Sequence, residues 1–260
     1  MNVFILTDLE GIPGVTDIEF MDRKGPKYIR TCSYLTDTLN LAIKCCFENK
    51  ADNVYYLDGH GGGGNINPEA VDERAVKCSI SSWQELLRTG KIDVQIELGA
   101  HARAGTLCGF LDHTLTSKEW FSHKVNGKEM SELSLHALLC SQYNVPIIAC
   151  IGDETACEQA KEYIPEIYTG AVKKALKRNL AIDYPNSEEI IAKTIKNALL
   201  SYENIGFYNT TFPAVIELTF YRTDMCDSVF ESCDTNVERV DARTLKKVIN
   251  RLESYEDLKF

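Results

Sequence analysis

The sequence lacks long hydrophobic runs and an excess of basic residues. Its longest apolar stretches reach only a handful of residues, far short of the roughly 20 that a membrane-spanning helix needs. Its 260 residues include 28 Lys and Arg against 38 Asp and Glu, which gives a formal charge of −10. Because no basic stripe is present to neutralise phosphates, we expect neither nucleic acid nor a membrane surface as a partner.

The ten cysteines also lack a regular arrangement, and no CxxC pair occurs among them. Most lie in apolar runs such as PIIACIG, which predicts reduced core residues and not a disulfide scaffold. The first residues, MNVFILTDLEG, have no basic segment before the apolar run and reach an acid at Asp8. They predict a buried first strand in place of a signal peptide, so we expect a cytoplasmic protein.

Strand-like and helix-like segments alternate along the chain. Apolar runs bounded by Gly or Asp predict strands at 3–8, 53–58, 76–81, 94–100 and 146–152. Helices are predicted at 30–48, 131–143, 154–163, 187–203 and 241–258, with a short one near Pro68. This order predicts an α/β fold with a largely parallel or mixed central sheet flanked by helices. Residues 214–222 alternate between apolar and polar side chains, which is typical of an antiparallel strand.

Acidic and histidine side chains follow the predicted strands at their carboxyl ends. Asp8 and Glu10 are two positions apart, so on an extended backbone both carboxylates face the same side. They repel each other there unless a cation or a proton lies between them. His60 and His101 follow the strands at 53–58 and 94–100. Carboxylates and neutral imidazoles are typical ligands of zinc, which favours a metal site over a strand cap and two ordinary hydrogen-bonded histidines.

Two other patterns keep alternative functions open. The stretch 59–64 contains GxGxxG after a strand, but a dinucleotide site needs a helix to begin at the third glycine, and Asn65–Pro68 intervenes. ILTDLEGI and CIGDETACE resemble segments of haloacid dehalogenase-like phosphatases, although Glu10 replaces the second Asp and Cys157 the final acid. The alternatives are therefore a metal-dependent phosphatase and a non-catalytic metal- or nucleotide-binding module.

Five segments taken in order resemble the zinc-dependent D-aminopeptidases of the DppA type. These segments are TDLEGI at 7–12, DGH at 58–60, GAHARAG at 99–105, DHT at 112–114 and NGKEMSEL at 126–133. Their order and spacing are compatible with that family from residue 1 to about 175, and the resemblance is faint beyond about 180. HARA together with DxEG is a specific combination.

The resemblance implies two zinc ions per subunit and a catalytic histidine. The metal ligands that it implies are Asp8, Glu10, His60, His101 and Glu132, with Asp8 bridging the ions. His113 falls where the family keeps its catalytic histidine, although Asp112 precedes it where the family typically has a small residue. A third metal ligand, or a loop residue bonded to Asp112, is the alternative for His113.

The remaining polar candidates have supporting roles or none. Asp58 lies two residues before His60 and is expected to orient that ligand. Arg103 is expected to bind a substrate carboxylate or the developing oxyanion, with a surface salt bridge as its alternative. His123 and His136 match nothing in the family pattern, so we expect them on the surface and on a helix face.

The sequence thus predicts a zinc metallo-aminopeptidase that hydrolyses the N-terminal peptide bond of short peptides. A preference for D-amino acids is implied by the resemblance alone, as is a homo-oligomer in the form of a decameric ring. The segment around 183–187 is the best candidate boundary. We expect residues 1–180 to form the metal-binding α/β catalytic part, and residues 181–260 a smaller C-terminal α+β part of the same compact unit.

Overall fold

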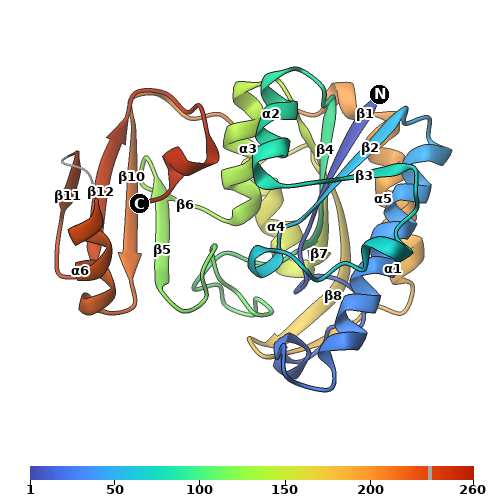
Figure 1. Ribbon diagram of the computed structural model, residues 1–260, viewed down its shortest axis with the longest axis horizontal. Coiled ribbons are helices and arrows are strands. Elements are labelled where there is room, and N and C mark those ends of the chain that lie inside the picture. The colour runs from blue at the N-terminus through green and yellow to red at the C-terminus, as the bar shows by residue number, and fades with distance from the viewer. Residues whose placement is uncertain (234–235) are drawn as a thin grey trace.

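The strands gather in two sheets in the computed structural model, which describes residues 1–233 and 236–260 (Figure 1). The strands are β1 (Asn2–Thr7), β2 (Asn53–Asp58), β3 (Ala75–Cys78), β4 (Val94–Ala100), β5 (Trp120–Val125), β6 (Lys128–Glu129), β7 (Ile147–Asp153), β8 (Tyr168–Lys177), β9 (Leu180–Asp183), β10 (Ala214–Phe220), β11 (Val237–Arg239) and β12 (Thr244–Ile249). The α-helices are α1 (Tyr28–Glu48), α2 (Ile80–Arg88), α3 (Glu132–Gln142), α4 (Glu154–Tyr163), α5 (Ser187–Leu200) and α6 (Thr223–Ser232). Short 3-10 turns are η1 (Ile18–Met21), η2 (His60–Gly62), η3 (Pro68–Ala70), η4 (Tyr202–Asn204) and η5 (Tyr255–Leu258).

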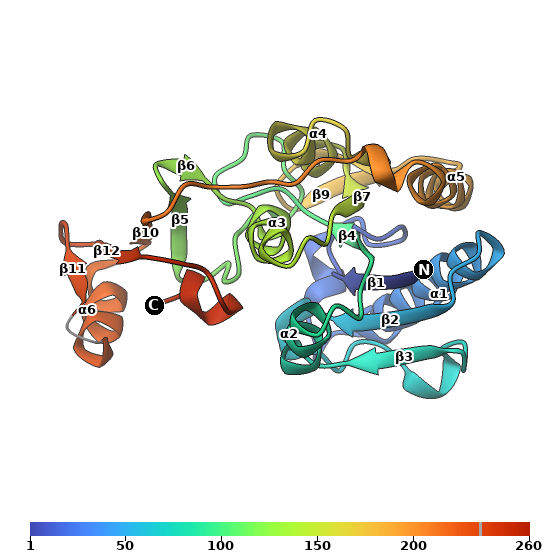
Figure 2. The ribbon, with the colours of Figure 1, turned by 90° about the horizontal axis from the view of Figure 1, so that it is seen from above.

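The larger sheet has the strand order β3-β2-β1-β4-β7-β8-β9, and only β9 in it pairs antiparallel to its neighbour. Helices α1 and α5 cover one face, while α2, α3 and α4 cover the other, as the two views show together (Figures 1 and 2). Strands buried on both faces need mostly apolar residues, which is why β1 and β7 are near-continuous apolar runs. The buried strand β4 also carries Gln95 and Glu97, whose side chains hydrogen-bond each other. The predicted α/β class with a mostly parallel sheet is confirmed.

The order of the strands creates a crevice between β1 and β4. Chain progression runs from β1 to β2 on one side and from β4 to β7 on the other, so the direction reverses between β1 and β4. Thr7 at the end of β1 pairs with both Asp58 and Leu98, which brings the carboxyl ends of β1, β2 and β4 to one level. Ligands of open α/β sheets bind at such reversal points.

The smaller sheet is antiparallel, in the order β11-β12-β10-β5-β6, and lies apart from the larger one with α3 between them (Figure 1). Buried and partly buried residues alternate along β10, which confirms the antiparallel strand predicted at 214–222. The helix predicted at 241–258 is wrong, because this segment forms β12 and η5 instead. Leu245, Leu252 and Tyr255 have helix-like spacing, but pairing of β12 with β10 and β11 overrides that local pattern.

Further segments differ from the sequence-based expectation, and β5, β8, β9 and α6 are among the elements that were not predicted. The strand predicted at 76–81 ends at Cys78, and Ser79 caps α2, a helix that was not predicted. Sheet membership does not divide the chain at residue 180, since β5 and β6 belong to the smaller sheet and α5 covers the larger one. The division into 1–180 and 181–260 therefore stays a prediction about domains.

Within the described residues, no helix has the length and apolar character that would let it cross a membrane.

Candidate metal centre

The segment Asp8–Gly11 carries two acids across the end of β4. The backbone N–H of Asp8 donates to the Leu98 carbonyl at 2.7 Å, and that of Gly11 donates to the Gly99 carbonyl at 2.8 Å. The approach is so close that a Cβ at Gly11 would overlap the Ala100 carbonyl. Glycine after the DxE pair is therefore a packing requirement that fixes where both carboxylates point.

A glycine loop after β2 holds the first histidine. His60 begins the short turn η2, and Gly61 to Gly64 all have positive φ, which L side chains rarely adopt. The Asp58 carboxylate closes this loop by accepting from the backbone N–H groups of Asn65 and Ile66. The loop leads into a 3-10 turn and not into a helix at the third glycine, so its geometry is not that of a dinucleotide-binding loop.

The second half of the cluster comes from the end of β4, the loop beyond it and the first turn of α3. Ser131 and Ser134 form a capping box that starts α3, and Glu132 is its first residue. The His101 and His113 rings stack with centroids 4.0 Å apart, and the Nε2 atoms of both rings face Glu132 Oε1 at 3.3 and 3.6 Å. His113 hydrogen-bonds the Leu111 carbonyl and not Asp112, which removes one alternative for this residue.

The structure brings together Asp8, Glu10, His60, His101, His113 and Glu132. Potential ligand atoms of Asp8, Glu10 and His60 all lie within 4.8 Å of one another, and so do those of His101, His113 and Glu132. Asp8 joins the two groups, because its Oδ1 lies 3.1 Å from His60 and its Oδ2 lies 3.2 Å from His101. With neutral imidazoles the cluster carries three negative charges, so it is suited to bind cations.

The pKa values of these groups follow from the same crowding of unlike charges. Burial alone would lower the pKa of His60, but Glu10 and Asp8 raise it to about 11. Burial alone would raise the pKa of Glu132, but His101 lowers it to about 2. Burial likewise opposes ionisation of Asp8, yet the neighbouring imidazoles of His101 and His60 hold its pKa well below the usual value. The cluster therefore favours positive charge beside ionised carboxylates.

One buried nitrogen shows where a cation fits. His101 Nδ1 lies 3.0 Å from the Ala102 carbonyl, which can only accept, so this nitrogen carries a proton. In the neutral ring, Nε2 would present a lone pair to the carboxylates of Asp8 and Glu132, and this nitrogen has no hydrogen-bond partner among the described residues. A lone pair facing two carboxylates is repulsive, and a divalent metal ion would make all three groups ligands. The donor set thus fits zinc.

The other predicted residues lie around the cluster without joining it. Asp58 supports the backbone of the His60 loop through Asn65, which also donates to the His60 carbonyl. Arg103 pairs with Glu162 at 2.9 Å, in line with its salt-bridge alternative. His123 is buried in β5, so the surface placement is wrong; its ring stacks on Trp120. His136 lies on α3 as expected, but it is buried and 3.2 Å from Glu97.

Sequence reasoning missed Lys173, a fully buried cation on β8. Its Nζ donates to the carbonyl of Glu10 at 2.8 Å and also to that of Val15, so it holds the segment that carries the acidic pair. Burial lowers the pKa of Lys173 to about 8. Nothing in the run KKALK distinguishes this lysine from Lys174, which is why the sequence gives no signal for it.

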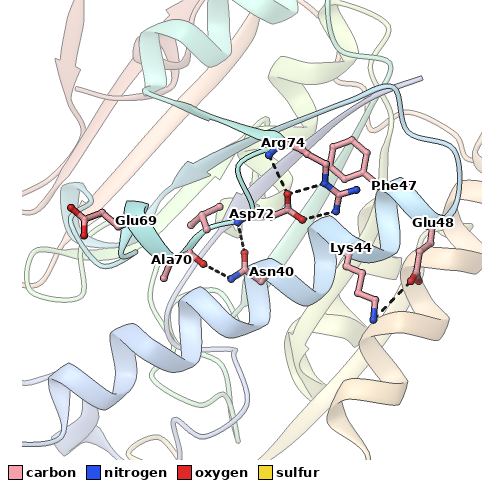
Figure 3. Close-up of a pocket in the computed structure, with 9 residues that line it drawn as sticks. Asn40, Lys44, Phe47, Glu48, Glu69, Ala70, Asp72 and Arg74 are labelled. Carbon is pink, nitrogen blue, oxygen red and sulfur yellow. Dashed lines mark hydrogen bonds and ion pairs between the residues drawn. The ribbon is translucent and has the colours of Figure 1, made fainter.

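A hollow of about 660 Å³ lies away from this cluster, between α1 and the segment before β3 (Figure 3). Its polar groups already bind one another: Arg74 pairs with Asp72, and Asn40 bonds the Ala70 carbonyl and the Asp72 N–H. Arg74 also lies over the Phe47 ring, 4.3 Å from its centroid. This hollow presents no unpaired polar cluster comparable to the one at the strand ends.

Comparisons with known proteins point in the same direction as this geometry. A model of the peptidase family M55, described as D-aminopeptidase, matches residues 1–257. A D-aminopeptidase of Bacillus subtilis (strain 168) is 29% identical over 182 residues, which are 69% of this chain and 66% of that relative, just under two thirds of its length. A solved structure described as the Zn-dependent D-aminopeptidase DppA from Bacillus subtilis, a self-compartmentalizing protease, matches with a TM-score of 0.90 and 22% identity. That match covers 99% of this chain and 95% of the other, and it shows a shared fold.

Proposed function

The chain belongs to the M55 family of D-aminopeptidases, and on that basis we propose that it is a two-zinc aminopeptidase acting on short peptides with an N-terminal D-residue. The observation that carries the proposal is the pair of ligand groups joined by Asp8. The names of both relatives support the D-preference, and the name of the structural relative also supports zinc.

The proposed metal site divides between the two sides of Asp8. Glu10 and His60 would bind one ion and His101 and Glu132 the other, with one oxygen of Asp8 directed to each side. Zinc in such a site polarises a carbonyl and lowers the pKa of bound water toward about 7. Lys173 and Asp58 contribute by holding the two loops that present Glu10 and His60.

His113 is proposed to move the proton that amide hydrolysis requires. Its Nδ1–H donates to the Leu111 carbonyl at 2.8 Å, which leaves the Nε2 lone pair directed toward the cluster. A neutral imidazole can take a proton at Nε2 and return it to the leaving amine. The competing role, a third ligand beside His101 and Glu132, uses the same lone pair.

The direct test is hydrolysis by metal-depleted and metal-resupplied protein. We expect chelated protein to be inactive, and Zn²⁺, Co²⁺ or Mn²⁺ to restore cleavage of D-Ala-p-nitroanilide with little cleavage of the L-isomer. Activity on p-nitrophenyl phosphate in place of the anilide would support the phosphatase alternative and contradict the proposal. Activity on neither substrate after zinc binding would support a non-catalytic metal-binding module.

We also propose that the chain forms a homo-oligomer that encloses its site, which the name of the structural relative supports. Light scattering during gel filtration is expected to give a mass several times that of one chain. A single-chain mass would contradict this assembly. The decameric count and the cytoplasmic location stay predictions.

A further inference from the structure

A cavity of about 270 Å³ lies against the metal cluster and shares Asp8 and Glu132 with it. Its other walls are mainly apolar and come from distant parts of the chain: Ile80 and Trp83 on α2, Trp120 on β5, and Tyr255 on η5. The cavity thus lies where the two sheets and the C-terminal segment meet. An apolar space beside a cluster of charged groups is typical of a site that orients a substrate.

Tyr255 forms part of the cavity wall and carries a buried hydroxyl. The residue is 4% exposed and lines the cavity, and its hydroxyl has no hydrogen-bond partner among residues 1–233 and 236–260. Its position is fixed, because its backbone N–H donates to Gln84 at 3.0 Å and its ring packs edge-on against Trp83. The fixed Tyr255 ring therefore supplies a rigid aromatic wall of the cavity.

A second hollow, of about 580 Å³, shares Asp8 and Glu132 but has a different character. Arg23, Lys118 and Arg178 line it. Arg23 donates to the Gly61 carbonyl and Arg178 pairs with Asp112, whereas the Lys118 side chain has no ion-pair partner within the described part of the chain. This larger hollow has room for the part of the peptide that follows the cleaved bond, and the Lys118 ammonium is available to the carboxylate at the end of that part.

We propose that the 270 Å³ cavity binds the side chain of the substrate's first residue, and that this residue is bulky and apolar, in particular aromatic. The inference rests on the proposed aminopeptidase function. The first residue ends the peptide, so a bounded cavity suffices for it, while the remainder needs the larger hollow. An apolar cavity of about 150 Å³ accepts benzene, so this one has room for an aromatic ring, and a methyl group would leave most of it unfilled.

Ile80 offers a way to fill the cavity without disturbing the core, because its side chain is 43% exposed at the start of α2. We expect the zinc-loaded wild type to cleave D-Phe-p-nitroanilide with a higher kcat/KM than D-Ala-p-nitroanilide. Ile80→Trp is expected to lower the ratio of these two values at least about tenfold, the range that one apolar side chain supplies. Ile29→Trp, a matched change at a residue 78% exposed on α1, is expected to leave the ratio unchanged.

Calorimetric binding of the products D-phenylalanine and D-alanine separates this inference from the proposed function. If D-phenylalanine binds more tightly than D-alanine and Ile80→Trp abolishes this difference, the cavity assignment is supported, whether or not a substrate is cleaved. Absence of cleavage would contradict only the proposed aminopeptidase activity. Cleavage with a Phe-to-Ala ratio at or below one, or with a ratio that Ile80→Trp leaves unchanged, would overturn the cavity assignment and leave the aminopeptidase intact.

Discussion

At the scale of single residues, the site depends on how one carboxylate is shared. Asp8 contacts histidines on both sides of the cluster, whereas Glu10 contacts His60 alone. Two neighbouring cations repel each other, and a carboxylate between them offsets that repulsion by serving both. In the proposed site, Asp8 would therefore hold two ions and Glu10 one.

Asp8→Ala is accordingly expected to lose more zinc than Glu10→Ala. Removal of the shared ligand weakens both positions, while removal of Glu10 leaves the group around His101 and Glu132 intact. Elemental analysis of the purified variants after dialysis against limiting zinc measures the difference, with circular dichroism as the check on folding. Equal zinc loss in the two variants, or full zinc content in Asp8→Ala, contradicts the shared role.

His113→Ala separates proton transfer from metal binding. If His113 moves a proton, the variant retains zinc and substrate affinity but loses about 10²-fold or more in turnover, as is usual for acid–base groups. Zinc stoichiometry measured beside kcat on the same preparation decides the role. A parallel fall in zinc would show that His113 is a ligand, and unchanged turnover would show that neither role holds.

At the scale of elements, the strand ends meet because glycines let their backbones approach. Gly99, within β4, has a φ of +92°, and a Cβ there would overlap the Asp8 carbonyl. Gly90, after α2, also has a positive φ of +63°, but a Cβ there would meet no atom within 4 Å. Alanine would therefore introduce backbone strain at both positions, but only at Gly99 would it also push Asp8 out of place.

Gly99→Ala is expected to lower the melting temperature and also to reduce zinc content, because Asp8 must shift. Gly90→Ala is the matched control, expected to cost about 1–2 kcal/mol for its left-handed backbone and to keep its zinc. Thermal unfolding and elemental analysis of both variants provide the comparison. Equal zinc content in the two would show that Asp8 does not depend on the close approach at Gly99.

The sequence predicts the part of the site that lies at strand ends better than the part that lies in loops. Asp8, Glu10, His60 and His101 follow apolar runs of the parallel sheet, and the strand ends of such a sheet meet in one crevice, so spacing alone predicts that these four side chains lie together. Glu132 and His113 come from loops whose path depends on long-range packing, and only the family resemblance pointed to them. Tyr255 and Lys173 carry no local signal, because their positions are set by tertiary contacts.

At the scale of the whole molecule, a buried histidine joins the smaller sheet to the C-terminal segment. His123 Nε2 donates to the Leu258 carbonyl at 2.7 Å, and Nδ1 is buried without a partner among the described residues. Burial lowers the pKa of His123 to about 4. The unfolded chain takes up this proton near pH 6.5 and the folded chain does not, so acid favours unfolding between these two values.

His123→Gln is expected to flatten this pH dependence, because the amide still donates to Leu258 and does not titrate. Linkage between a folded pKa near 4 and an unfolded value near 6.5 makes the His123 contribution about 2 kcal/mol smaller at pH 5 than at pH 7. Urea unfolding of both proteins at the two pH values gives the difference directly. The same loss of stability in His123→Gln as in the wild type would assign the acid sensitivity to other groups.

The central claim, that side chains from the ends of β1, β2 and β4 and the start of α3 form one two-zinc site, is tested most directly by diffraction at the zinc absorption edge. Crystals grown with excess zinc are expected to show two anomalous peaks per chain. One is expected to contact Glu10 and His60, the other His101 and Glu132, with Asp8 contacting both. No peak at the cluster, or a single peak held by other residues, would contradict the account.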